Sequence, residues 1–284
     1  MSEAAPTPPP PGDSQQLMSF SEHLGELRTR LKYALYALLV GVGIAYLFSD
    51  FLFVLLAQPL VTAWSEAGLG PPKIHFANPI EPFFTYIKIS ILGGLFIAAP
   101  AVFYQLWKFI APGLYKNEKK YVIPFSMISA LFFVGGAAFG YFIVFPYGFQ
   151  FFLSFAKDNM GSMQKLFGQQ VKLGVNTKTF ELKPTLMMGE YFGLVWRLLL
   201  AFGLIFELPL LLVFLSMVGL VTHRGLWKWN PYFAVLSFII AAVLTPPDVI
   251  TQLFMAGPLI VLYNISIIFA WFFTKRNEKK RAVT

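Results

Sequence analysis

The stretch QLWKFIAPGLYKNEKKY (Gln105–Tyr121) lies between two long apolar segments and decides how the chain is arranged. It holds four lysines and one glutamate, most of them in its second half. Charged side chains at this density must stay in water, because burying them in hydrocarbon is costly. The stretch therefore marks one face of a membrane, and the apolar segments on either side of it enter the membrane from that face.

The composition also indicates a membrane protein. Of the 284 residues, 57% are apolar, 18% aromatic and only 13% charged, whereas a soluble domain carries about 25% charged residues. The chain has no cysteine, which excludes disulfides and thiolate metal sites. The net charge of +8 comes from basic residues that border apolar segments. This placement argues against a nucleic-acid partner.

Six apolar segments can be membrane-spanning helices, each of which needs ~20 residues, although the fifth segment is shorter than this. They are roughly Tyr33–Leu56, Phe83–Trp107, Val122–Phe145, Leu186–Val221, Pro231–Leu244 and Val249–Phe273. We therefore expect an all-α integral membrane protein with six transmembrane helices. Pro59 is expected to end the first helix, and Thr222–Asn230 to form a basic interfacial turn. The short fifth segment covers only ~21 Å at ~1.5 Å per residue, which predicts a thinned membrane.

Six spans place both termini on the same side of the membrane. That side collects the larger set of basic residues: Arg28, Arg30, Lys32, Lys108, Lys116, Lys119, Lys120, Arg224, Lys228 and those of Lys275–Arg281. The other side holds Lys73 and five lysines of the loop 146–184. The excess predicts that both termini are cytoplasmic. The expected organisation is a disordered Pro-rich tail (1–18), a transmembrane domain (19–273) and a basic tail (274–284).

Glu207 is the most informative single residue, because it lies near the middle of the fourth apolar segment. A carboxylate at this depth costs at least ~2.5 kcal/mol, and such residues usually face a cavity or a partner. Pro209 removes one helical hydrogen bond and crowds the carbonyl of Ile205, so we expect a kink beside the carboxylate. The alternative is a structural role, in which a protonated carboxyl group bonds the freed backbone.

Three other acids have plain structural interpretations. Glu118 lies among lysines and can be a solvated charge of a basic loop. Glu26 can pair with Arg30 one helical turn later. Asp248 fits the capping acid of the turn Thr245–Asp248.

Two patterns concern helix packing and the membrane interface. Gly136 and Gly140 have the small-xxx-small spacing that lets helices approach closely in lipid. Trp107 and Phe109 fit an aromatic belt at the membrane surface.

Sequence motifs of catalysis are absent. The chain contains none of the HExxH, GxSxG, GxxxxGK[ST] or GxGxxG patterns,. His23, His75 and His223 are scattered between the two faces, too far apart to share a metal. We expect neither an enzyme nor a metal or cofactor site.

Five motifs in order resemble the TatC family, the multispanning core subunit of the twin-arginine protein translocase. They are HLGELRTRL (His23–Leu31), the break at Pro59, YQLWKFIAPGLYKNEKK (Tyr104–Lys120), FGLIFELP (Phe202–Pro209) and LTPPDVITQ (Leu244–Gln252). The resemblance extends from Ser19 to Phe273. It implies a concave, glove-like bundle in a bacterial inner membrane.

The resemblance also implies a function. TatC-like proteins bind twin-arginine signal peptides at the cytoplasmic face, assemble with single-span TatA/TatB-type partners, self-associate, and export folded proteins using the proton-motive force. The family's arginine-binding acids fall on Glu26 and Glu118, with Arg28 and Phe109 in the same region. Its membrane-embedded acid falls on Glu207, which would contact the single-span partners.

A secondary transporter or proton-conducting protein built around Glu207 is the alternative function. It predicts several deep ionisable groups and usually an internal repeat, whereas only Glu207 lies deep in the sequence pattern.

Overall fold

The structure, a computed structural model, describes residues 20–110, 122–156, 185–244 and 249–281. In chain order the elements are α1 (Phe20–Leu47), α2 (Ser49–Glu66), β1 (Ile74–His75), α3 (Glu81–Ile110), α4 (Val122–Phe139), the π-helix η3 (Gly140–Val144), β2 (Leu186–Met187), α6 (Met188–Phe206), α7 (Leu208–Val218), α8 (His223–Leu244) and α9 (Val249–Arg281). Helical residues also continue from η3 to residue 156. The two short strands pair in parallel.

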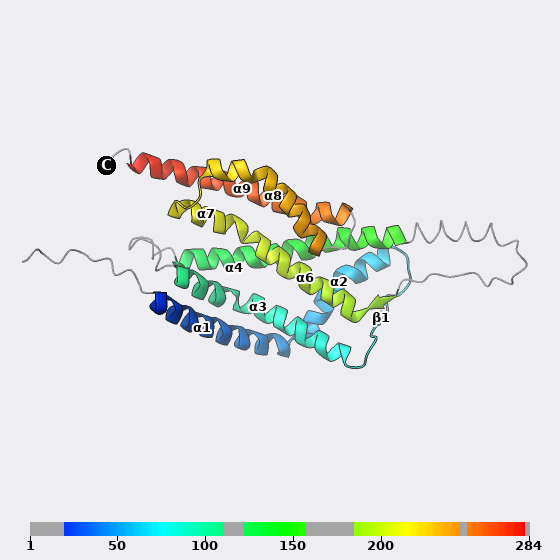
Figure 1. Cartoon of the computed structure of the whole chain (residues 1–284). Coiled ribbons are helices and arrows are strands. Elements are labelled where there is room, and N and C mark those ends of the chain that lie inside the picture. Colours follow the sequence, from blue (N-terminus) through cyan, green and yellow to red (C-terminus); the bar gives the residue numbers. More distant parts are fainter. Residues whose placement is uncertain (1–19, 111–121, 157–184, 245–248, 282–284) are drawn as a thin grey trace, which may run out of the picture.

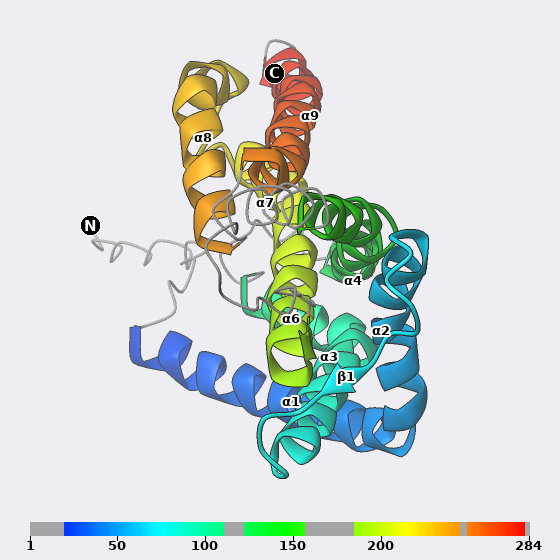
Figure 2. The ribbon, with the colours of Figure 1, turned by 90° about the vertical axis from the view of Figure 1, so that its right-hand side faces the viewer.

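Six helical stretches of the described chain are long and apolar enough to cross a membrane, which confirms the predicted six-span, all-α fold. They are Ser21–Leu47, Glu81–Ile110, Val122–Ala156, Met188–Val218, His223–Val243 and Gln252–Phe272. The start of α1 and the end of α9 lie at the same end of the bundle (Figure 1). Seen along the helices, α1 forms one edge of a curved wall, α8 and α9 form the other, and α6 lies between them (Figure 2). The bundle is therefore concave, as expected.

The prediction that Pro59 ends the first helix is wrong. The first span ends at Leu47, the chain turns at Phe48, and α2 runs in a new direction with Pro59 buried inside it (Figure 2). Proline lacks an N–H, so within a helix it leaves the carbonyl four residues earlier without its usual donor. Here the Tyr141 hydroxyl donates to that carbonyl, the oxygen of Leu55, at 2.7 Å. This replacement bond lets α2 continue to Glu66.

The expected interfacial turn at Thr222–Asn230 is also wrong, because α8 already begins at His223. Thr222 caps the helix: its Oγ1 accepts a hydrogen bond from the Gly225 N–H at 3.2 Å,. The basic and aromatic residues of this stretch interrupt the run of apolar residues, but they do not prevent it from forming a helix. At 22 residues, α8 reaches ~33 Å at ~1.5 Å per residue. The thinned membrane that a 14-residue span predicted is not needed.

Glycines bring α4 and α6 into close contact, as the Gly136–Gly140 spacing predicted. A Cβ on Gly136 would lie 2.4 Å from the carbonyl oxygen of Phe202, and one on Gly140 would lie 2.8 Å from the Phe202 ring. On α6, a Cβ at Gly203 would lie 2.7 Å from the Phe133 ring. These distances leave no room for a methyl group, so the two helices touch backbone to backbone.

A second glycine contact joins α1 to α3, and it was not predicted from the sequence. A Cβ on Gly41 would lie 2.5 Å from the carbonyl oxygen of Gly94, and one on Gly94 would meet the backbone of Val42 at 2.5 Å. The two glycines come from separate segments. Neither segment alone shows which partner it meets.

Glu81 ties together the end of the bundle opposite the termini. Its Oε2 accepts the N–H of Ala77 at 2.8 Å, and its Oε1 accepts the N–H of Gly189 in the first turn of α6. A carboxylate at a helix start is favourable because it binds N–H groups that have no helical acceptor. Glu81 thus fixes the starts of α3 and α6 relative to each other.

The packing of α4 on α6 generates a prediction. Gly136→Ala should destabilise the protein by about 1–3 kcal/mol, since the added methyl group forces the two helices apart. Thermal unfolding of the purified protein in detergent, followed by tryptophan fluorescence, measures the effect. The control is Gly135→Ala, whose Cβ meets nothing within 4 Å. An equal loss of stability in both variants would contradict the close contact.

Candidate functional site

The first part of the candidate site lies where α1 begins and α3 ends. The ring of His23 stacks on the ring of Phe109, with centroids 4.5 Å apart and planes 18° apart. This contact fixes the first turns of α1 against the last turn of α3. Phe109 is half-buried, so it is a packing surface between two helices as well as an interfacial aromatic residue.

Glu26 lies one turn along α1 from His23 and pairs with Arg30, as its spacing predicted. The Arg30 Nη2 donates to the Glu26 Oε1 at 2.9 Å, and the Glu26 side chain is 16% exposed. The other carboxylate oxygen, Oε2, has no hydrogen-bond partner among the described residues. An ion pair thus holds the carboxylate in place, while its second oxygen is buried and lacks a donor among the described residues.

Arg28 is exposed on the same turn of α1. Glu118 and Asp248, two other residues that the sequence singled out, lie outside the described residues. Their assigned roles remain predictions.

Glu207 occupies a break in the fourth span, as predicted from Pro209. α6 ends at Phe206 and α7 begins at Leu208. The Glu207 N–H donates to the carbonyl of Leu204 at 3.1 Å, and its own carbonyl accepts the N–H of Leu211 at 2.9 Å. Pro209 has no N–H to offer to the previous turn. The carboxylate therefore projects from an interrupted helix, a common place for polar groups within a membrane.

The Glu207 side chain is half-buried, and its Oε1 has no hydrogen-bond partner in the described part of the chain. The Ser129 hydroxyl of α4 lies beside the carboxyl group. Ser129 is fully buried, and its Oγ accepts a hydrogen bond from Trp107 Nε1 at 2.8 Å. A polar path thus runs from α3 through α4 to the break between α6 and α7.

Trp107 corrects the expected aromatic belt. Its side chain is only 6% exposed, and its ring contacts those of Phe125 and Phe214, each at 4.9 Å between centroids. It is a core residue that carries the buried N–H of the polar path. This burial could not be predicted, because an interfacial and a buried tryptophan have the same sequence pattern near a helix end. Ser129, in an apolar helix, also carried no signal.

The end of α3 contacts both parts of the candidate site: the surface with His23 and Glu26, and the buried polar path that leads to Glu207. Phe109 contacts α1 and Trp107 contacts Ser129, and both belong to the C-terminal turns of α3. Within the ranges that the structure describes, no group of three histidine or acidic side chains could hold a metal ion.

A family model described as "Sec-independent protein translocase protein (TatC)" matches residues 22–258 of the chain. This match covers both parts of the site. The chain belongs to the TatC family.

Relatives of the same description are similar over nearly their whole length. The TatC protein of Desulforapulum autotrophicum is 45% identical over 259 residues, which cover 91% of this chain and 86% of that protein. The TatC protein of Aquifex aeolicus is 37% identical over 262 residues, which cover 92% and 98%. A solved structure titled "Crystal Structure of Twin Arginine Translocase Receptor- TatC" superposes with a TM-score of 0.68 at 37% identity, covering 89% of this chain and 99% of that one.

Family membership decides between the two functions that the sequence allowed. The protein is a bacterial multi-pass membrane component of a protein translocase, and it is not an enzyme. The comparisons give no support to a transporter built around Glu207.

The buried path from Trp107 to Glu207 generates a prediction. Ser129→Ala removes the acceptor of the Trp107 N–H and should cost about 1–3 kcal/mol of stability, since a buried donor is left unsatisfied. The matched control is Ser126→Ala on the same helix, whose hydroxyl donates to the carbonyl of Val122 within its own helix. Thermal unfolding of both variants in detergent checks this, and equal melting temperatures would rule out a stabilising Trp107–Ser129 bond.

Proposed function

We propose that the end of the bundle formed by α1 and α3 is the receptor site for twin-arginine signal peptides. The observation that supports this most is the Glu26 carboxylate. One oxygen is held by Arg30 and the other has no partner among the described residues. The Phe109–His23 stack beside it offers an aromatic surface for the rest of the peptide.

The chemistry of arginine suits such an acceptor. A guanidinium group presents its donors in a planar fork, binds carboxylates with good geometry and also stacks on aromatic faces. A lysine ammonium has the same charge without the fork. Arg30 restricts the Glu26 side chain before the peptide arrives, which lowers the entropy lost on binding. The site is therefore expected to prefer arginine to lysine.

A second acid is needed for two consecutive arginines, and we assign this role to Glu118. It belongs to the segment between α3 and α4, and the helix ends that flank this segment lie at the same end of the bundle as the start of α1 (Figure 1). Arg28 is part of the same region and would favour contacts with peptide carbonyl groups.

The orientation follows from the basic residues. The end of the bundle where α1 begins and α9 ends also holds the end of α3 and the start of α8 (Figure 1), which carry Arg28, Arg30, Lys108, Arg224 and Lys228 among the described residues, so it faces the cytoplasm of a bacterial inner membrane. Signal peptides of newly made proteins would then reach α1 and α3 directly.

Glu207 is assigned to the contact with single-span TatA/TatB-type partners. The carboxyl group lies at a helix break, and its buried Oε1 lacks a donor among the described residues; a neighbouring transmembrane helix that packs against the break would supply one. Copies of this receptor and its partners would assemble into a complex that exports folded proteins with the proton-motive force.

Binding of a twin-arginine signal peptide tests the receptor site. The purified protein in detergent should bind this peptide at least about tenfold more tightly than its twin-lysine version, since charge-assisted fork contacts are each worth ~1.5–3 kcal/mol. Glu26→Gln should remove most of this preference. Fluorescence anisotropy of a labelled peptide gives the affinities.

The matched control is Glu190→Gln, which removes the same charge from an exposed position at the opposite end of the bundle. It should leave both affinities unchanged. If Glu26→Gln kept the full preference for arginine, Glu26 would not belong to the site.

Glu207→Ala separates the two assigned roles. It should leave peptide binding within about twofold while strongly reducing co-purification of the single-span partners, because the carboxyl group lies in the membrane and away from the α1 surface. Arg197→Ala, an exposed position ten residues earlier, is the control. Equal loss of peptide binding and of partners would show a folding defect and would refute a separate contact at Glu207.

A further inference from the structure

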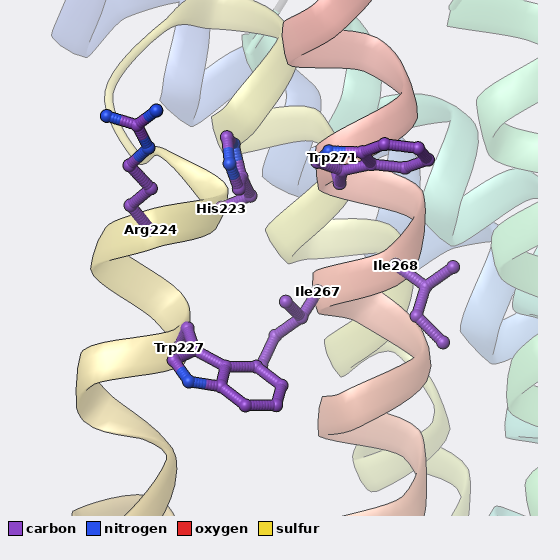
Figure 3. Close-up of a pocket in the computed structure, with 6 residues that line it drawn as sticks. All are labelled: His223, Arg224, Trp227, Ile267, Ile268 and Trp271. Atoms are coloured by element: carbon purple, nitrogen blue, oxygen red, sulfur yellow. The ribbon is translucent and has the colours of Figure 1, made fainter.

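We propose that a groove between α8 and α9 binds an anionic phospholipid. The groove has a volume of about 360 Å³, within the range of small-molecule sites. It is lined by His223, Arg224, Trp227, Ile267, Ile268 and Trp271 (Figure 3). None of the residues assigned to peptide or partner binding belongs to it.

The groove is polar at one end and apolar along its walls. His223 and Arg224 belong to the first turn of α8, whereas Trp227 and Ile267 face each other further along the helices (Figure 3). The walls are open to the outside, since Trp227 is 66% and Ile268 57% exposed. Such a surface suits a ligand that has a charged head and a hydrocarbon body.

The polar end favours an anion. Arg224 is exposed, and the Nδ1 atom of His223 is buried without a hydrogen-bond partner in the described part of the chain. Among the described residues that line the groove, none is acidic. Lys228 follows one turn after Arg224 on α8. The Arg224 guanidinium points away from α9 (Figure 3), so a phosphate group that accepts hydrogen bonds from it would lie at the outer edge of the groove.

The position in the membrane favours a lipid over other anions. The start of α8 lies at the same end of the bundle as the start of α1 and the end of α9 (Figure 1), and Trp227 and Trp271 are residues typical of the headgroup level. Basic pockets between transmembrane helices at this level bind phospholipid headgroups. A soluble anion would not use the apolar walls, and an apolar partner helix would leave His223 and Arg224 without an acceptor.

The walls of the groove are in place without a ligand, because side chains of α8 and α9 contact each other along the two helices. The Tyr263 hydroxyl donates to the carbonyl of Leu226 at 2.9 Å, and the Tyr263 ring stacks on Phe233 with centroids 4.0 Å apart. Further along, the side-chain amides of Asn230 and Asn264 share a hydrogen bond of 3.0 Å. These contacts fix the distance between the walls before any lipid arrives.

Native mass spectrometry of the full-length protein in detergent tests the site. The protein is titrated with phosphatidylglycerol and with phosphatidylcholine of the same acyl chains. The wild type should retain phosphatidylglycerol more tightly. Arg224→Gln should lower this preference by about fivefold, the effect of one basic residue near an anionic membrane surface. Arg224→Lys should keep most of the preference.

Two further variants locate the effect. Arg197→Gln removes an exposed arginine of α6 whose Nε donates to the Gly193 carbonyl of its own helix, and it should change nothing. Trp227→Ala removes an apolar wall and should weaken both lipids. The proposal is overturned if Arg224→Gln leaves the preference unchanged. It is also overturned if water-soluble glycerophosphate displaces the bound lipid, or if only a single-span partner helix, and no lipid, occupies the groove.

Discussion

The structure depends on one constraint: inside a membrane, each interruption of a helix must find a new partner for the backbone groups that it frees. Pro59 within α2 meets this constraint through the hydroxyl of Tyr141, which donates to the carbonyl of Leu55. The neighbouring carbonyl of Leu56 accepts the Tyr191 hydroxyl at 2.6 Å. These two tyrosines tie α2 to η3 and to α6, so a helix that does not itself span the membrane becomes part of the core.

The same constraint explains the position of the intramembrane acid. The break at Glu207 interrupts the fourth span and places a carboxyl group beside Ser129, which in turn accepts the N–H of Trp107. Trp107 and Phe109 lie two residues apart at the end of α3. A displacement of this helix end by a bound peptide would therefore be felt both at the α1 surface and at the buried path. The end of α3 thus lies between the two proposed sites.

The sequence predicted features that depend on local spacing. The six spans, the break beside Pro209, the close approach at Gly136 and the Glu26–Arg30 pair are all confirmed. Each of them follows from residues within a few turns of one helix.

Features that depend on distant residues could not be predicted. Pro59 continues a helix because of a tyrosine 82 residues later in the chain, and the burial of Trp107 depends on rings from other helices. The start of α8 was missed because charged residues hid it from a count of apolar ones. Glu207 stood out from the residues alone, whereas Glu26 entered the candidate site only through the family resemblance. By itself its spacing indicated an ordinary surface ion pair.

We propose that the second carboxylate oxygen of Glu26 accepts a guanidinium group of the signal peptide. A double-mutant cycle tests it most directly, combining Glu26→Gln with replacement of each peptide arginine by citrulline, which keeps the shape and removes the charge. A coupling energy of about 1–3 kcal/mol is expected for one of the two arginines, as found for groups in contact. Additive effects within about 0.5 kcal/mol for both arginines, as found for independent sites, would contradict it.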